Sequence, residues 1–126
     1  MSNYSRMNRF STFRAAALLL ATSLSLSSAA NAATWCSGKV AQIFTTRGGS
    51  VVILPYFSND YVQICELNTH WKGVPPITCA YWNATITTGM LKGKDFTFYY
   101  DDATAVCSTM PAYSGAPSPY YIMVNE

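Results

Sequence analysis

Hydrophobic and polar residues alternate in three short runs between residues 39 and 67, a pattern typical of half-buried β-strands. The runs are Lys39–Thr46, Val51–Phe57 and Tyr61–Leu67. Arg47–Ser50 contains two glycines and Ser58–Asp60 is polar, so both segments have the composition of turns. Pro55 is expected at an edge or a bulge, because proline has no N–H to donate to a β-ladder. The pattern therefore predicts a three-stranded meander.

The apolar spacing changes to a helical period after residue 75. The residues that recur every three or four positions are Cys79, Trp82, Ile86 and Met90. Pro75 and Pro76 suit the start of a helix, and Gly93 suits its end. A strand is the alternative for Ala84–Thr88, because β-branched residues fill most of that segment.

Strict alternation returns in Asp95–Asp101, where Phe96, Phe98 and Tyr100 share one face, and Tyr120–Val124 is expected to be a closing strand. These elements predict a mainly β domain with one helix (α+β). The order of strands and helix is that of a small OB-like barrel with five or six strands, and a β-sandwich is the alternative.

Residues 1–32 have the composition of an export signal that is cleaved. The segment contains three arginines, the apolar stretch Ala15–Leu26 and the small residues Ala30-Asn31-Ala32. The apolar stretch is shorter than the roughly 20 residues that cross a membrane. We therefore expect cleavage after Ala32, or after Ala33, rather than an uncleaved anchor. A single domain, residues 33–126, would remain without an integral membrane segment.

Charge and cysteine content narrow the class of this domain. Residues 33–126 contain five Lys and Arg and six Asp and Glu, a net charge of 5 − 6 = −1, so they lack the basic surface that nucleic acid requires. Four cysteines in an exported domain predict two disulfides, and three pairings are open. We favour Cys65–Cys79, from a strand to the helix start, and Cys36–Cys107, from the first strand to the end of a late one. The expected location is periplasmic or secreted.

Residues that could perform catalysis or bind a metal are scarce. His70 is the single histidine, and no Cys-x-x-Cys or Gly-x-Ser-x-Gly motif occurs. Asp101 and Asp102 are expected in a turn, because adjacent strand residues point to opposite faces. We expect a protein that is not an enzyme and uses no metal or cofactor.

Aromatic residues are unusually abundant, and fifteen of them lie in residues 33–126. Rings on both faces of Asp95–Asp101 mean that some are exposed or lie in an interface. Aromatic faces also stack on sugars, which favours a binding module. Tyr81, Thr85 and Thr88 would lie on the outer face of the helix, where the lack of charge is typical of a homo-oligomer interface.

Several short motifs in Ser37–Cys107 resemble the B subunits of subtilase-cytotoxin and typhoid-toxin type, and more broadly small exported proteins of Gram-negative bacteria. They are Ser37-Gly38-x-Val40, Cys65 at a strand end, Cys79 ahead of the helix, and Gly93-Lys94-x-Phe96-x-Phe98-Tyr99-Tyr100. The B subunits of that family are OB-fold pentamers that bind sialylated glycans.

This resemblance implies a glycan-binding role for Ser37, which matches the family serine that bonds the sugar carboxylate. The family's sugar-contacting tyrosine has no counterpart, since Gly89 and Met90 occupy that region, and Cys36 also departs from the pattern. We therefore expect a non-catalytic module that binds a glycan or protein receptor. The alternative is a periplasmic or envelope domain with a structural or protein-interaction role.

Overall fold

The computed structural model describes residues 33–126, so the predicted export signal, residues 1–32, lies outside the described residues. The elements are, in chain order, β1 (Thr34–Gly38), β2 (Val40–Thr45), β3 (Ser50–Pro55), β4 (Val62–Glu66), α1 (Pro76–Leu91), β5 (Asp95–Tyr100), the 3-10 turn η1 (Cys107–Thr109) and β6 (Tyr121–Asn125). None of the helices described is long and apolar enough to cross a membrane. The domain is mainly β with one α-helix, as predicted.

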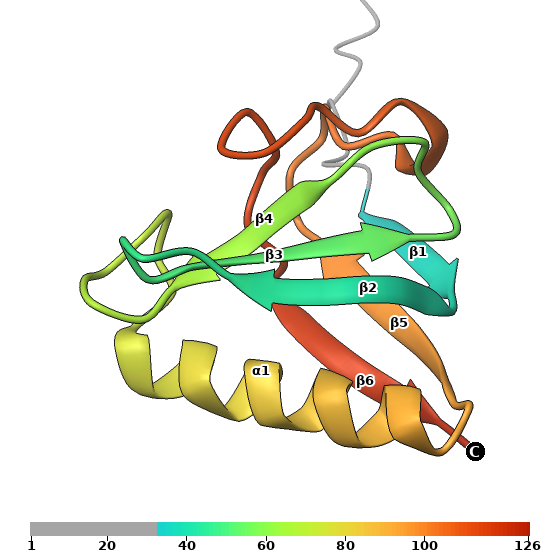
Figure 1. Ribbon diagram of the computed structural model, residues 1–126. Coiled ribbons are helices and arrows are strands. Elements are labelled where there is room, and N and C mark those ends of the chain that lie inside the picture. Colours follow the sequence, from blue (N-terminus) through green and yellow to red (C-terminus); the bar gives the residue numbers. More distant parts are fainter. Residues whose placement is uncertain (1–32) are drawn as a thin grey trace, which may run out of the picture.

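The strands form two antiparallel sheets with the orders β2-β3-β4 and β1-β5-β6. The first sheet is the predicted meander. β1 and β2 are one stretch of chain interrupted at Lys39, so this stretch contributes an edge strand to each sheet (Figure 1). A parallel bridge between Val62 and Tyr113 joins β4 to the loop before β6. Within residues 33–126, no continuous ladder closes the two sheets into a barrel.

α1 extends from Pro76 to Leu91 and lies along one side of the two sheets (Figure 1). The helix prediction is confirmed, and the alternative of a strand at Ala84–Thr88 is wrong. Cys79 and Ile86 are buried, and Trp82 and Met90 pack against the core, so the predicted apolar stripe faces inward. Packing on this face stabilises a helix whose threonines would otherwise weaken it.

Gly89 allows α1 to approach β5 closely. A Cβ atom at this position would lie 2.6 Å from Cζ of Phe96 and 3.6 Å from Cγ1 of Val124. The contact places the helix directly on the inner face of β5, where Phe96, Phe98 and Tyr100 are fully buried. The predicted alternation along β5 is therefore confirmed.

The first strand begins earlier than the sequence indicated. β1 starts at Thr34, whereas the predicted strand began at Lys39, which is the point where the chain passes from one sheet to the other. Within β1, Cys36 is the one fully buried residue. A strand with one inward residue is too short to show an alternating pattern.

The structure contains both favoured disulfides. Cys36 is bonded to Cys107 and Cys65 to Cys79, with Cα–Cα distances of 5.4 and 5.5 Å. The first joins β1 to η1, and the second joins β4 to the first turn of α1. Structural disulfides persist in oxidising compartments, so this pairing indicates an extracytoplasmic location.

Candidate functional site

A row of aromatic side chains crosses the outer face of the β1-β5-β6 sheet. Trp35, Tyr99 and Tyr121 are direct partners on the three strands. Each is adjacent in sequence to an inward-facing residue, so its own side chain points outward. The ring centroids of Trp35 and Tyr99 are 5.0 Å apart, and those of Tyr99 and Tyr121 are 4.8 Å apart. Trp35 Nε1 donates a 3.0 Å hydrogen bond to the Tyr121 hydroxyl, and this bond links the two outer residues of the row.

The aromatic row is accessible from solvent. Trp35 is 57% exposed, and neighbouring Tyr120, whose ring meets that of Tyr99 edge-on at 6.0 Å, is 68% exposed. Large rings on a sheet surface offer a flat apolar area with polar atoms at its edge. The sequence predicted exposed rings but did not identify these residues, because their contact depends on the pairing of three strands that are distant in sequence.

Three polar side chains, Ser37, Thr97 and Asn125, lie beside the aromatic row on the same face, and we call them the polar row. Thr97 is buried, and its direct partner on β6, Met123, is 47% exposed. Ser37 and Thr97 are paired across β1 and β5, and their hydroxyl oxygens are 2.8 Å apart. Asn125 Nδ2 donates to Thr97 Oγ1 at 3.0 Å. Thr97 Oγ1 also lies 3.3 Å from Asn125 Oδ1, so Thr97 can donate either to Asn125 or to Ser37; when it donates to Ser37, the Ser37 hydroxyl hydrogen can bond a ligand. The structure thus places the predicted residue Ser37 on an accessible surface, within a hydroxyl–amide network that the sequence did not indicate.

An ion pair borders the polar row. Lys39 Nζ lies 3.7 Å from Asp95 Oδ1 and donates a 2.7 Å hydrogen bond to the Gly93 carbonyl. Both side chains are about half exposed. Because the two opposite charges cancel, they add no net charge to the surface beside the aromatic row, where Ser37 and Met123 are exposed.

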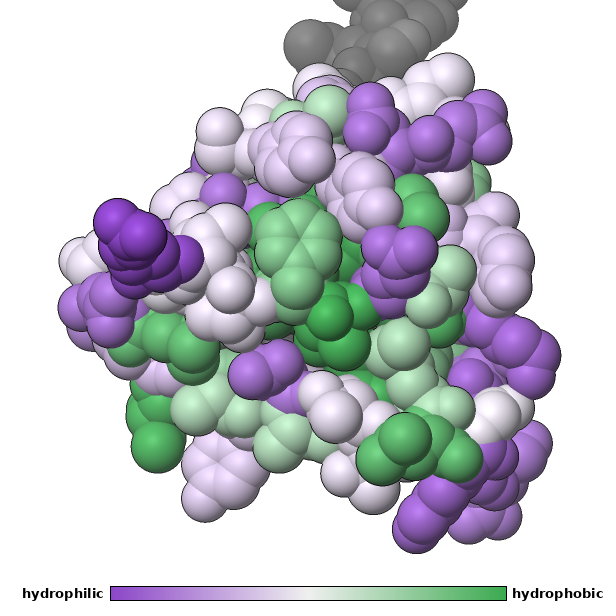
Figure 2. Space-filling model, viewed as in Figure 1, coloured by the Kyte–Doolittle hydropathy of each residue, from purple (hydrophilic) through white to green (hydrophobic). Residues whose placement is uncertain are grey.

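The outer face of α1 is exposed and has no charged side chain. Ile77, Tyr81 and Leu91 are 65%, 70% and 87% exposed. Figure 2 shows the surface over this helix as mostly white and green, with purple gathered beyond its right-hand end. Of the predicted interface residues, Tyr81 and Thr88 are exposed on this face, whereas Thr85 is half-buried.

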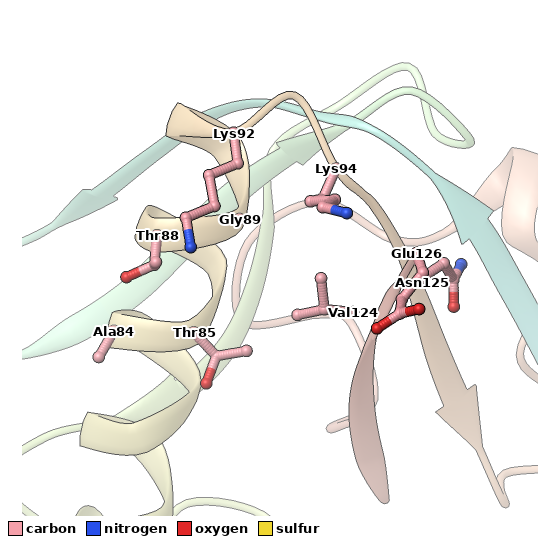
Figure 3. A pocket seen from close by; sticks show the side chains of 9 residues that line it. All are labelled: Ala84, Thr85, Thr88, Gly89, Lys92, Lys94, Val124, Asn125 and Glu126. Carbon is pink, nitrogen blue, oxygen red and sulfur yellow. The ribbon is translucent and has the colours of Figure 1, made fainter.

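Thr85 lies in a groove of about 620 Å³ between α1 and β6 (Figure 3). Thr85 and Thr88 form the helix side of the groove, and Val124 lies opposite them. Lys92 and Lys94 lie at its end. Asn125 lines the groove and also bonds Thr97, so the groove adjoins the polar row.

Two hollows of about 380 and 390 Å³ lie at the loops near β5 and β6, and both are lined by Lys72, Asp101 and Ser118. Lys72 Nζ donates to the carbonyls of Ser114 and Ala116, and the Ser118 hydroxyl donates to the Lys72 carbonyl at 2.6 Å. Lys72 therefore joins two loops that are distant in sequence. We call the larger hollow, which is also lined by Trp82 and Tyr120, the Asp101 pocket.

Three side chains that could act as acids or bases in catalysis, those of Glu66, His70 and Asp101, are not connected to one another. Glu66 is buried and accepts a 2.7 Å hydrogen bond from Ser50, His70 is exposed, and Asp101 lines the loop hollows. Among residues 33–126, no hydrogen bond or ion pair joins these three side chains. In the same part of the chain, no three His, Cys, Asp or Glu residues are grouped to hold a metal ion.

Asp101 and Asp102 both line the smaller hollow, and they lie in the loop after β5, where the sequence predicted a turn. The chain leaves β5 after Tyr100, so strand geometry no longer separates their side chains. Asp102 Oδ1 accepts hydrogen bonds from the hydroxyl and the backbone N–H of Thr104, and these bonds lower the pKa of Asp102.

Comparison with protein-family models, curated proteins and solved structures finds no significant match to this chain. The geometry of the sites must therefore carry the functional argument. The outer face of the β1-β5-β6 sheet combines exposed aromatic rings with the exposed Ser37 hydroxyl group.

Proposed function

We propose that this protein is an exported, non-catalytic module that binds carbohydrate on the outer face of the β1-β5-β6 sheet. The observation that carries the proposal is the aromatic row Trp35–Tyr99–Tyr121 directly beside the polar row Ser37–Thr97–Asn125. A sugar ring presents an apolar C–H face and a rim of hydroxyl groups. The two rows complement these two properties at the spacing of adjacent side chains on one sheet.

Ser37 provides the polar contact in this proposal. A hydrogen bond between neutral groups contributes about 1 kcal/mol, and one to a carboxylate contributes about 1.5–3 kcal/mol. When Thr97 is the donor in the Ser37–Thr97 bond, the Ser37 hydroxyl hydrogen favours an acceptor on the ligand, most strongly the carboxylate of a sialylated glycan. Trp35 would contribute the larger apolar contact, since it is the most exposed ring of the aromatic row.

An OB-like barrel and a relationship to the toxin B subunits remain part of this proposal. The continuous β1–β2 stretch shared by two sheets, the helix after the meander and the parallel Val62–Tyr113 bridge support that architecture. Closure of the barrel would require further pairing beyond this bridge.

Glycan binding by the wild type and two variants tests the proposal. Trp35→Ala removes the exposed ring and Ser37→Ala removes the hydroxyl donor, so each should weaken binding of a sialylated or neutral glycan by about fivefold or more. Phe44→Ala is the control, because Phe44 is a partly exposed ring on β2, in the other sheet. If a folded wild type binds no glycan on an array, the alternative of a periplasmic or envelope interaction domain replaces this proposal.

We also propose that copies of the chain associate through α1. A surface helix ordinarily carries charged or polar residues on its outer face, yet α1 has no charged residue and presents exposed residues at the alternating spacing of three and four that packs helices together. These residues are Ile77, Tyr81, Ala84, Thr88 and Leu91. Association would place several weak glycan sites on one particle and raise the avidity.

A further inference from the structure

The Asp101 pocket has walls of two chemical kinds. Trp82 and Tyr120 contribute aromatic rings from α1 and from the residue before β6. Asp101, at the end of β5, contributes a carboxylate. The volume of about 390 Å³ lies within the range of small-molecule sites, which begins at about 300 Å³.

The Asp101 carboxylate is available to a ligand. It is exposed, and it has no hydrogen-bond or ion-pair partner among residues 33–126. Lys72 also lines the pocket, but the hydrogen bonds of its ammonium group go to other partners. This group donates to the carbonyls of Ser114 and Ala116 and lies 4.6 Å from the centroid of the Trp71 ring. The pocket therefore offers two free acceptor oxygens beside aromatic surface.

Tyr120 connects this pocket to the aromatic row. Its ring lines the pocket and also contacts the rings of Tyr99, at 6.0 Å, and Tyr121, at 6.5 Å. Its backbone N–H donates to the Tyr99 carbonyl at 2.7 Å, which holds the residue against β5. A glycan that is bound to the aromatic row and is longer than one sugar unit would extend into this pocket.

We propose that the Asp101 pocket is a second saccharide subsite, which takes an uncharged sugar unit with adjacent hydroxyl groups. This inference rests on the proposed glycan binding and adds the class of sugar at this position. A carboxylate accepts hydrogen bonds from two neighbouring hydroxyl groups, and Trp82 and Tyr120 cover the apolar face of the ring. A carboxylated sugar is disfavoured, because its charge would face the Asp101 carboxylate, while the Lys72 ammonium group that also lines the pocket is hydrogen-bonded to the carbonyls of Ser114 and Ala116.

Neutral and charged forms of one sugar test the subsite. Titration of the ¹⁵N-labelled protein with methyl β-glucoside, methyl β-galactoside and methyl α-mannoside should shift the amides of Asp101, Ser118 and Tyr120 for at least one of them. Methyl β-glucuronide, which differs from the glucoside by a carboxylate, should bind several-fold more weakly at the same amides. Asp101→Asn should lower the affinity for the neutral sugar about tenfold, as expected for loss of a charge-assisted hydrogen bond.

Two variants separate this inference from the proposed function. Asp60→Asn alters an exposed aspartate of the β3–β4 turn and should leave affinity unchanged. Trp35→Ala should leave single-hexose binding in the pocket intact while weakening longer glycans. Shifts confined to Trp35 and Ser37, or equal affinity of Asp101→Asn and Asp60→Asn, would overturn the subsite but retain the proposed function. No shift anywhere with any of these glycosides or with longer glycans would overturn both.

Discussion

The hydroxyl group of Tyr100 lies in the core without a hydrogen-bond partner among the residues described. An unpaired buried hydroxyl costs about 1–3 kcal/mol. Tyr100→Phe should therefore raise the free energy of unfolding by about 1 kcal/mol, as measured by urea denaturation. Tyr81→Phe, at an exposed position, should leave it unchanged. A loss of stability in Tyr100→Phe would show that the hydroxyl has a partner in solution.

The same burial predicts a dependence on alkaline pH. Burial raises the pKa of Tyr100 above its ordinary value of about 10, so the folded state holds this proton more tightly than the unfolded state. The contribution of Tyr100 protonation to the free energy of unfolding is therefore complete below about pH 10, and it falls as the pH rises further. Unfolding measured between about pH 8 and pH 11 should show this decline, and Tyr100→Phe should reduce it. Equal slopes for the two proteins would contradict the assignment.

Single residues also mark how far the sequence predicts the site. The outward position of Ser37 follows from β1, a strand that the sequence did not predict, and its candidate role came from a family resemblance. Its bond to Thr97 depends on the register of β1 on β5, which is set by packing between segments 60 residues apart. The aromatic row depends on the same register and on that of β6, so no local pattern could identify it.

Among the elements, α1 was predictable because its prolines, its apolar stripe and its terminal glycine all indicate a helix between the same limits. Gly89 was the exception, since a glycine inside a helix ordinarily counts against one. The structure shows that Gly89 is fully buried against the Phe96 ring. Contact between a helix and a strand cannot be recognised from the helix alone.

Gly89→Ala should destabilise the protein. A Cβ atom would overlap the Phe96 ring, and such overpacking costs about 1–3 kcal/mol, which exceeds the roughly 1 kcal/mol gained in helix propensity. Urea denaturation should show a net loss of about 1 kcal/mol. Gly48→Ala is the control, because a Cβ there would have its nearest neighbour at 3.8 Å. Greater stability of Gly89→Ala would mean that α1 can move away from β5.

For the whole domain, the two disulfides limit the unfolded chain to different extents. They span 14 and 71 residues, so the loop-entropy model assigns about 3 kcal/mol to Cys65–Cys79 and about 4 kcal/mol to Cys36–Cys107. Replacing Cys36 and Cys107 with alanine should therefore lower the free energy of unfolding more than replacing Cys65 and Cys79 with alanine. Denaturant unfolding of the two double variants measures it, and a larger loss for the shorter loop would indicate that packing at α1 dominates.

The proposed association through α1 is also a property of the whole molecule. Tyr81→Glu places a charge on the exposed helix face and should convert an oligomer to monomer in sedimentation velocity at tens of micromolar protein. Tyr56→Glu is a matched control, because Tyr56 and Tyr81 are both 70% exposed. A wild type that is monomeric under these conditions, or equal loss in the two variants, would contradict the proposed interface.

The position of Cys36 has a consequence for when the proposed recognition surface forms. This cysteine lies between Trp35 and Ser37, so a five-residue edge strand carries a covalent crosslink and both proposed recognition residues. In a reducing compartment the strand would lose its covalent link to η1 and would be held by pairing with β5 and by hydrogen bonds of Thr34 and Trp35. We therefore expect recognition to be acquired during maturation: a newly made chain would contain every recognition residue, but would hold them in place only after it meets an oxidant.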